Sequence, residues 1–364
     1  MPFRSMLSFT FLCLFSSYGM ASGLVNNLYH TERVISAVFS QSDLNDAMSS
    51  AMEEVLVRVS GDANVSDENQ IKNQLSVARN YLANFHYEGS AETLTNVLGE
   101  VVKTKKLVME FDRLRIKNLL SESNMPIWDE ARPSVLVFLA LETSSRREVF
   151  SSVDSHELVD ALSSAALVKG IPYELPLMDI EDEIAISPSE VWGLFSDSIA
   201  TASKRYNNEY ALAGRVYQDQ QQWISEWLVV GPNDEVTRFE VSSEDSEGLM
   251  NQTVGKLAKV MSQHYSVLLS GEAKYQVDIA VTGIATLHEY EQALDLLNGL
   301  SVVKQANVTA VEGVNISYQL DSYSTKEKLI DILRLNQQHF RQLMNDGSEI
   351  QLQWVSDVES VTSN

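Results

Sequence analysis

The spacing of apolar side chains alternates along the chain between a helical and an extended period. Between Ser42, a favoured amino-terminal cap, and Gly61, a favoured stop, apolar residues recur every three or four positions, which predicts a helix. Residues 101–111 alternate instead, as a strand with one buried face does. Residues 135–141 are apolar almost without interruption, which is typical of a strand buried on both faces. The mixture predicts an α+β fold.

The predicted elements group into three regions, which we expect to be three small domains: 22–131, 132–272 and 273–364. A chain of 364 residues exceeds what one hydrophobic core usually organises. The last region has the order βαββαβ of a ferredoxin-like split βαβ unit, with a further helical segment expected within 336–345. The other strands expected are 27–38, 171–175, 209–217, 222–230, 235–241, 275–281, 301–310, 314–320 and 350–355. The other helices expected are 71–82, 114–120, 156–169, 188–204, 246–269 and 287–300, and a further helix capped by Ser324.

Residues 1–21 have the pattern of a secretory signal peptide. Arg4 supplies the positive start, residues 6–18 supply an apolar stretch, and Ala21 is a small residue before the expected cleavage at Ser22. The stretch is too short to span a bilayer, so no membrane anchor is expected after cleavage. The only cysteine, Cys13, lies inside this segment after Leu12, where a lipoprotein cleavage site needs a small residue. We therefore expect a cysteine-free mature protein in a bacterial periplasm.

The charge of the chain excludes some classes of partner. Cleavage would remove one arginine from 27 Lys+Arg and none of the 50 Asp+Glu, which takes the formal net charge from −23 to −24. Such a chain repels nucleic acid and anionic lipid. The central region is the most acidic, with 10 basic and 22 acidic residues, a net charge of −12. The charge is compatible with basic protein surfaces, cations or neutral ligands as partners.

Several short stretches together resemble a known family. They are residues 56–61 (LVRVSG), 85–88 (FHYE), 125–128 (MPIW), 170–176 (GIPYELP) with Asp179 and Asp182, 187–193 (SPSEVWG) and 202–217. Their order is similar to that in a gammaproteobacterial envelope family known as domain of unknown function 2066. The resemblance implies secretion to the periplasm and supplies no activity and no catalytic residue. At the level of fold alone, the small α+β domains also resemble periplasmic assembly proteins.

Metal and cofactor sites are not favoured by the sequence, and we expect no cofactor. The six histidines, at positions 30, 86, 156, 264, 288 and 339, never fall three or four residues apart. The acidic run of Asp179, Glu181 and Glu183 places Glu190 at the twelfth position of a calcium loop. Ile184 occupies the sixth position, where a calcium loop needs glycine, so a solvated loop is the favoured interpretation.

Catalytic motifs are equally weak. Ser301 and Lys304 have the spacing of the Ser-x-x-Lys pair of penicillin-binding enzymes, but they lie in a predicted strand without the partner motifs. Gly255 and Lys256 lack the earlier glycine of a phosphate-binding loop. No catalytic residue is predicted, and the chain is more consistent with a non-enzymatic protein, although a hydrolase with a composite site stays open.

The aromatic residues give the one candidate binding face. Trp223 and Trp227 fall four apart in a predicted strand and so share a face, with Tyr206 and Tyr217 near in sequence. Such a face binds a sugar ring or a protein partner when it is exposed, and forms core when a helix covers it; the core is the favoured interpretation. We therefore expect an envelope adaptor or assembly factor, with a glycan- or peptidoglycan-binding protein, or one that acts on peptidoglycan, as the alternative.

Overall fold

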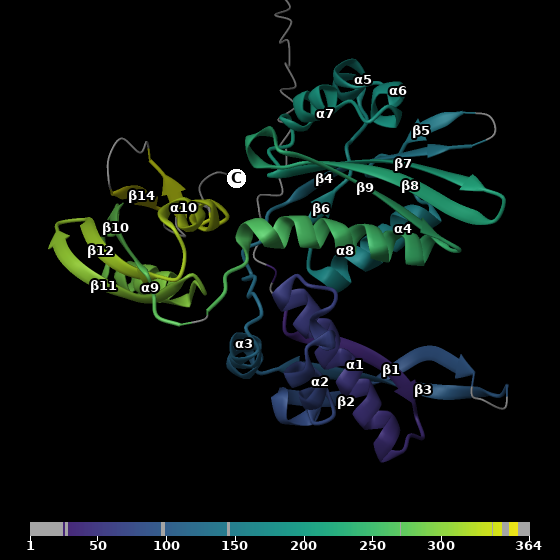
Figure 1. The fold of residues 1–364 in the computed structure, drawn as a ribbon, viewed down its shortest axis with the longest axis horizontal. Coiled ribbons are helices and arrows are strands. Elements are labelled where there is room, and N and C mark those ends of the chain that lie inside the picture. Colours follow the sequence, from purple (N-terminus) through teal and green to yellow (C-terminus); the bar gives the residue numbers. More distant parts are fainter. Residues whose placement is uncertain are drawn as a thin grey trace, which may run out of the picture.

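The computed structural model describes residues 25, 28–95, 99–143, 146–269, 271–336, 338–343 and 349–355. The strands form three separate sheets, which lie within residues 30–111, 135–243 and 275–354 (Figure 1). Helices accompany each sheet, so the predicted α+β fold with several domains is confirmed. The predicted signal peptide lies outside the described residues.

The first domain is a three-stranded antiparallel sheet with a long helix on one face. The strand order is β1 (His30–Ser36), β3 (Val101–Phe111), β2 (Leu82–Thr95), which leaves β1 at an edge. The helix α1 (Gln41–Ser60) is capped by Ser40 in a capping box with Asp43, two residues before the predicted cap, and ends at Gly61 with φ 70°. The remaining elements are η1 (Val65–Asp67), α2 (Asn69–Leu75), η2 (Ala78–Tyr81) and α3 (Arg113–Glu122).

The central domain is a six-stranded mixed sheet with helices on both faces. The sheet order is β5-β4-β7-β8-β9, with β6 also paired to β4. Helices α4 and α8 cover one face, and α5, α6 and α7 cover the other (Figure 1). The bounds are β4 (Val135–Glu142), β5 (Arg147–Val149), α4 (Glu157–Lys169), β6 (Tyr173–Glu174), α5 (Ile180–Ala185), α6 (Pro188–Trp192), α7 (Ser196–Ser203), β7 (Tyr210–Asp219), β8 (Gln222–Val230), η3 (Pro232–Asp234), β9 (Val236–Ser243) and α8 (Ser246–Tyr265).

Two predictions for this domain were wrong in detail. The acidic run predicted as a solvated loop forms the helix α5, because the Asp179 side chain accepts from the backbone N–H groups of Glu181 and Asp182 and caps it. The single helix predicted over 188–204 is broken into α6 and α7, because Leu194 adopts a left-handed conformation with φ 52°. Pro188 and its cap Ser187 begin α6 as predicted.

The third domain is a five-stranded sheet with two helices, in the order β11-β12-β10-β14-β13. The predicted helical segment within 336–345 was wrong, since its described part carries the short strand β13, which turns the chain so that β14 runs parallel to β10. The predicted βαββαβ order is thereby extended by one strand. The bounds are β10 (Tyr275–Thr282), α9 (Leu287–Gly299), β11 (Val303–Glu312), β12 (Asn315–Ser322), α10 (Lys326–Arg334), β13 (Phe340–Gln342) and β14 (Ile350–Trp354).

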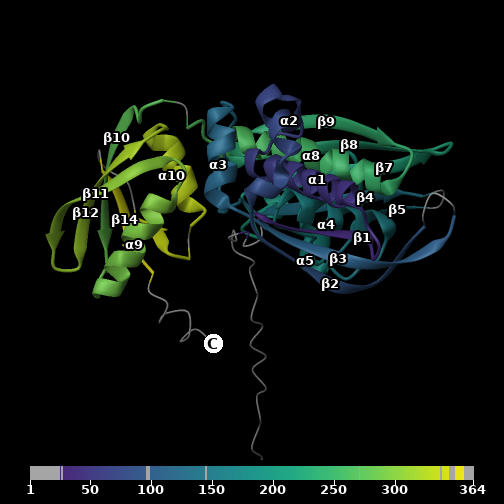
Figure 2. The ribbon, with the colours of Figure 1, turned by 90° about the horizontal axis from the view of Figure 1, so that it is seen from below.

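The segment between α3 and β4 ties the three domains together (Figure 2). The backbones of Ile127 and Val267 exchange hydrogen bonds of 2.8 Å each, and the N–H of Trp128 donates to the carbonyl of Val59 at 2.7 Å. The Asp129 carboxylate accepts from Lys117 in the first domain and from the backbone N–H of Ser301 in the third, at 2.9 and 2.7 Å. The connecting segment is therefore a shared core element and not a flexible linker.

Candidate functional site at the joint of the first two domains

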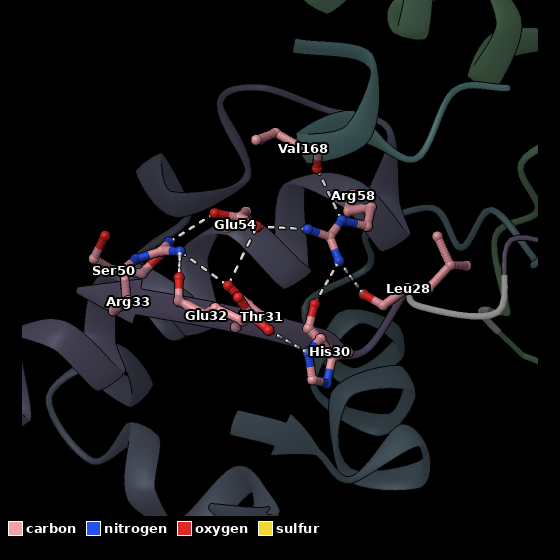
Figure 3. Close-up of polar contacts among 9 residues, drawn as sticks. All are labelled: Leu28, His30, Thr31, Glu32, Arg33, Ser50, Glu54, Arg58 and Val168. Carbon is pink, nitrogen blue, oxygen red and sulfur yellow. Dashed lines mark hydrogen bonds and ion pairs between the residues drawn. The ribbon is translucent and has the colours of Figure 1, made fainter. Parts of the chain in front are cut away.

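Arg58 is the ionic centre of the joint between the first two domains. It lies in the last turn of α1, next to the apolar residues that pack this helix against the first sheet. Its side chain is buried, at 6% exposed, and reaches past the end of β1 to the carboxyl end of α4 (Figure 3). A buried guanidinium requires hydrogen-bond acceptors on every side, and the geometry supplies them.

Every nitrogen of Arg58 donates a hydrogen bond (Figure 3). Nε donates to the backbone carbonyl of Val168, a residue of α4 in the central domain, at 2.8 Å. Nη1 donates to the carbonyls of His30 and Leu28 at 2.8 and 3.1 Å, and Nη2 donates to the carboxylate of Glu54. One side chain therefore holds α1, β1 and α4 together.

Glu54 accepts from two arginines at once. Its second oxygen, Oε2, lies 2.7 Å from Nη2 of Arg33, and Thr31 donates its hydroxyl to Oε1 at 3.3 Å. Arg33 also donates to the carbonyls of Glu32 and Ser50, at 2.9 and 3.2 Å. A carboxylate shared by two guanidiniums is satisfied at both oxygens, and it leaves the cluster with one net positive charge.

The same contacts protect the edge of the first sheet. β1 pairs only with β3 among the described strands, so its other side presents unpaired backbone groups. Arg58 donates hydrogen bonds to the outward carbonyls of Leu28 and His30, and Arg33 donates one to the carbonyl of Glu32. An edge whose carbonyls are occupied in this way cannot accept the regular ladder of an added strand along its first half.

A pocket of about 560 Å³ lies between β1 and the end of α4. One wall is polar and carries the arginine–glutamate cluster, and the other is formed by mostly apolar residues of α4 and the turn after it. Gly170 lies in that turn with φ 64°, and a Cβ there would come within 3.0 Å of Leu28 and 3.2 Å of Arg58. The lining residues are Val25, His30, Thr31, Glu32, Arg33, Glu54, Arg58, Ala166, Leu167, Val168, Gly170, Ile171 and Pro172.

Burial sets the electrostatics of the joint. Desolvation lowers the pKa of Arg58, with Glu54 opposing that shift, and desolvation likewise lowers the pKa of the neighbouring Lys169. Behind Arg58, the fully buried Arg132 donates to the Arg58 carbonyl at 2.9 Å, and its guanidinium carbon lies 3.7 Å from the ring centre of Trp128. Burial lowers the pKa of Arg132 to about 9.

The chemistry available in this pocket is that of binding. Glu54 is engaged by three donors, and the Thr31 hydroxyl donates to it, so neither is poised as a base or a nucleophile. Arg33 and Arg58 are committed to protein acceptors, so they do not form an open anion site. The geometry fixes two domains relative to each other and leaves an open, mixed apolar and polar hollow beside them.

The aromatic residues of the predicted binding face lie in different places. Trp223 and Trp227 face α4 and α8 in the core, at 7% and 0% exposed, and Nε1 of Trp227 donates to Ser225 at 2.8 Å. Tyr206 belongs to the opposite side of the sheet, where its hydroxyl donates to Asp182. Tyr217 packs near Trp192, with ring centres 6.3 Å apart. The structure brings the two tryptophans together but separates them from the tyrosines.

The other candidate residues also have protein partners. Asp179 forms a two-point pair with Arg205 at 2.6 and 2.7 Å. Ser301 lies between α9 and β11, and its hydroxyl meets Lys117 and Asp129 instead of Lys304. Among the described residues no group of three His, Cys, Asp or Glu side chains is placed to hold a metal ion. The histidines stay dispersed, with His30 at the pocket rim 3.3 Å from Glu110.

Sequence reasoning did not single out Arg58 as a functional residue, because most of its acceptors are backbone carbonyls, up to 110 positions away. One signal was present in the sequence. Arg58 interrupts an apolar run at the end of a helix, between Val57 and Val59, and a charge at such a place needs a buried partner.

The amino-terminal part of the chain is similar to a known protein family. A family described as Domain of unknown function (DUF8605) matches residues 23–129, and this corrects the resemblance to domain of unknown function 2066. No curated protein matches the chain. A solved structure, the LpoB C-terminal domain from Salmonella enterica, matches with 11% identity and a TM-score of 0.22, over 31% of this chain and 83% of its own, which is too low to support an inference. Within the described residues, the helices are all too short or too polar to cross a membrane.

Proposed function

We propose that this protein is an exported, non-catalytic adaptor that holds protein partners in the bacterial periplasm. The observation that carries the proposal is the Arg58 joint. It fixes the first sheet to the central domain through protein–protein hydrogen bonds, while the polar groups beside its pocket are already satisfied. A rigid platform of this kind presents several surfaces in a constant relative orientation, which is what an adaptor requires.

The export part of the proposal rests on the sequence of residues 1–21. Its test is amino-terminal sequencing of the protein recovered from a periplasmic extract. The expected first residue is Ser22 or a residue within a few positions of it. Full-length protein confined to the cytosol would contradict export.

The adaptor part is tested by photo-crosslinking in living cells. A photoreactive residue is placed singly at Leu114, Leu167 or Leu287, which are exposed and lie in the first, central and third domains. Discrete adducts with other envelope proteins are expected from at least one position. The control is the same probe at Val55, which is fully buried and should give none. Mature protein that forms no protein adduct at any of the three positions would overturn the adaptor proposal.

Glycan binding is a second candidate, and the open face of the third sheet favours it. Gln276, Gln319 and Gln351 lie on neighbouring strands on the face opposite the buried core. Asp278 and Asp321 share this face and accept hydrogen bonds of 3.4 Å from the side-chain amides of Gln319 and Gln276, respectively. Amide groups of this kind can bind sugar hydroxyls. Sedimentation with isolated peptidoglycan tests this candidate. Binding that is lost in Gln319→Ala together with Gln351→Ala would favour it, and the absence of binding by the intact protein would exclude it.

A further inference from the structure

The helix α5 presents an apolar ridge to solvent. Ile180 and Ile184 lie one turn apart and are 76% and 82% exposed, and Leu177, just before the helix, is 54% exposed. A hydrogen bond of 2.9 Å from Ser152 N–H to the Pro176 carbonyl brings the turn that carries the exposed Val153 next to this segment. Single exposed apolar residues are ordinary, but several gathered in one place mark an interaction site.

Buried contacts on the opposite side of α5 hold this ridge in place. Asp182, on the inner side of α5, is buried and accepts from Arg205 at 2.7 Å and from the hydroxyl of Tyr206. Asp179 caps the helix and pairs with Arg205 through both of its oxygens. Arg205 therefore clamps the two carboxylates of α5 to the end of α7.

The clamp explains how so short a helix is kept in place. An isolated helix of six residues is not stable in water, since the cost of nucleation exceeds what so few hydrogen bonds return. The buried contacts on one side supply the missing stabilisation, and the isoleucines on the other side contribute none to the fold because they are exposed. Two large apolar side chains are thus displayed on an ordered support.

The surroundings of the ridge are acidic. Glu181 and Glu183 lie on α5 between the isoleucines, and the central region as a whole has a net charge of −12. The Glu181 side chain is 72% exposed and lies 3.5 Å from Nε of Arg205, so that one arginine is shared among Asp179, Glu181 and Asp182. An open hollow of about 480 Å³ is lined by Asp179, Ile180, Glu181 and Ile184. Apolar side chains surrounded by carboxylates are complementary to an apolar stripe flanked by lysine or arginine.

We infer that the α5 ridge, defined as Leu177, Ile180 and Ile184, binds a basic amphipathic helix of a partner protein. The inference rests on the proposed adaptor function and names the chemistry of one partner. A helix fits because ridges of side chains four apart pack into the grooves of another helix. A second copy of this face would bring like charges together, and an anionic membrane would be repelled for the same reason.

The test uses the full mature chain and a synthetic helix of leucine and lysine with the leucines on one face. Binding is followed by fluorescence anisotropy of the labelled peptide. Ile180→Ser with Ile184→Ser should weaken binding by roughly tenfold or more, because each removes a side chain that becomes buried in the complex. Glu181→Gln with Glu183→Gln should weaken it less, and the loss should shrink at an ionic strength where the Debye length is about 3 Å.

The matched control is Leu287→Ser, which removes an equally exposed apolar side chain from the third domain. It should bind the peptide as the unaltered protein does. All variants should keep their melting temperature, since the altered side chains are exposed. Equal binding by the isoleucine variant, or equal binding of a peptide with its leucines scattered around the helix, would overturn the ridge proposal. So would ridge-dependent sedimentation with neutral phosphatidylcholine vesicles, which would assign the ridge to a lipid surface.

The two proposals fail in different ways. If the adaptor proposal is correct and the ridge assignment is wrong, the crosslinked adducts persist while the isoleucine variant binds the peptide normally. If the adaptor proposal is wrong, no protein adducts form at the three probe positions.

Discussion

Replacing Gly214 by alanine should destabilise the central domain through one side chain, Trp227. The two residues lie opposite each other on β7 and β8, and the indole ring covers the glycine. A Cβ at position 214 would come within 2.1 Å of Cζ3 and 2.2 Å of Cε3 of Trp227, whereas ordinary contacts begin at 3.4 Å. The ring would therefore have to move by more than 1 Å.

The ring has little freedom to move. Trp227 is fully buried, and its Nε1 donates to Ser225, whose hydroxyl in turn donates to the Val241 carbonyl at 3.1 Å. Overpacking of this kind costs about 1–3 kcal/mol, and loss of the indole hydrogen bond costs about 1 kcal/mol more. We expect Gly214→Ala to lower the free energy of unfolding by about 2–4 kcal/mol, a large part of a typical domain's stability.

A double-mutant cycle measured by circular dichroism in denaturant tests the cause. In a Trp227→Leu background the clash is absent, so Gly214→Ala should then cost less than about 0.5 kcal/mol. The sum of the two single-variant costs should exceed the cost of the double variant by about 1.5–4 kcal/mol. Additive costs would refute the reasoning, because they would mean that the ring does not cover position 214.

Three further predictions concern the joint, the clamp and metals. Arg58→Ala should lower the free energy of unfolding by about 3–5 kcal/mol, because it leaves buried acceptors unpaired. The control Arg113→Ala, at an exposed ion pair, should cost less than about 1 kcal/mol. Similar costs for the two variants in denaturant titrations would contradict the role of the joint. Arg205 and the backbone N–H of Asp182 lower the pKa of Asp179 from 3.8 to about 2, so its contribution to stability is present above about pH 4 and lost as the pH falls through 2. An NMR titration should find that Arg205→Ala raises that pKa towards 3.8, and an unchanged value would contradict the clamp. A chelator should leave the melting temperature unchanged, and a drop of several degrees would reveal a metal site.

Local signals in the sequence were sufficient for most elements, but not for the long strand β2, which was not predicted, nor for some short elements. The run of residues 135–141 predicted β4, and Ser187 with Pro188 predicted the start of α6, because caps and buried strands depend on neighbouring residues. The helix α5 was not predicted because its stability comes from Arg205, more than twenty positions away. β13 was mistaken for a helix because three residues carry too little periodicity to decide.

The joint was beyond local reasoning for a similar cause. The sequence shows that Arg58 lies in an apolar run, but its main acceptors are backbone carbonyls, and every residue has one. Only the folded topology brings the carbonyls of His30 and Val168 to the same point. By contrast, the period of the strand was sufficient to place Trp223 and Trp227 on one face, because residues two apart on a strand share a face. The covering of that face by α4 and α8 depends on the folded topology.

The Arg58 joint also constrains how this chain can change over evolution. The match to the family ends at residue 129 of this chain. Val168 and Gly170, which Arg58 contacts or approaches, lie well beyond that boundary. If the first domain were transferred to another protein, its new neighbour would need a backbone carbonyl where Val168 supplies one and a glycine where Gly170 lies. Arg58 and Gly170 should be inherited as a pair across the domain boundary, and lineages that replace one should replace the other.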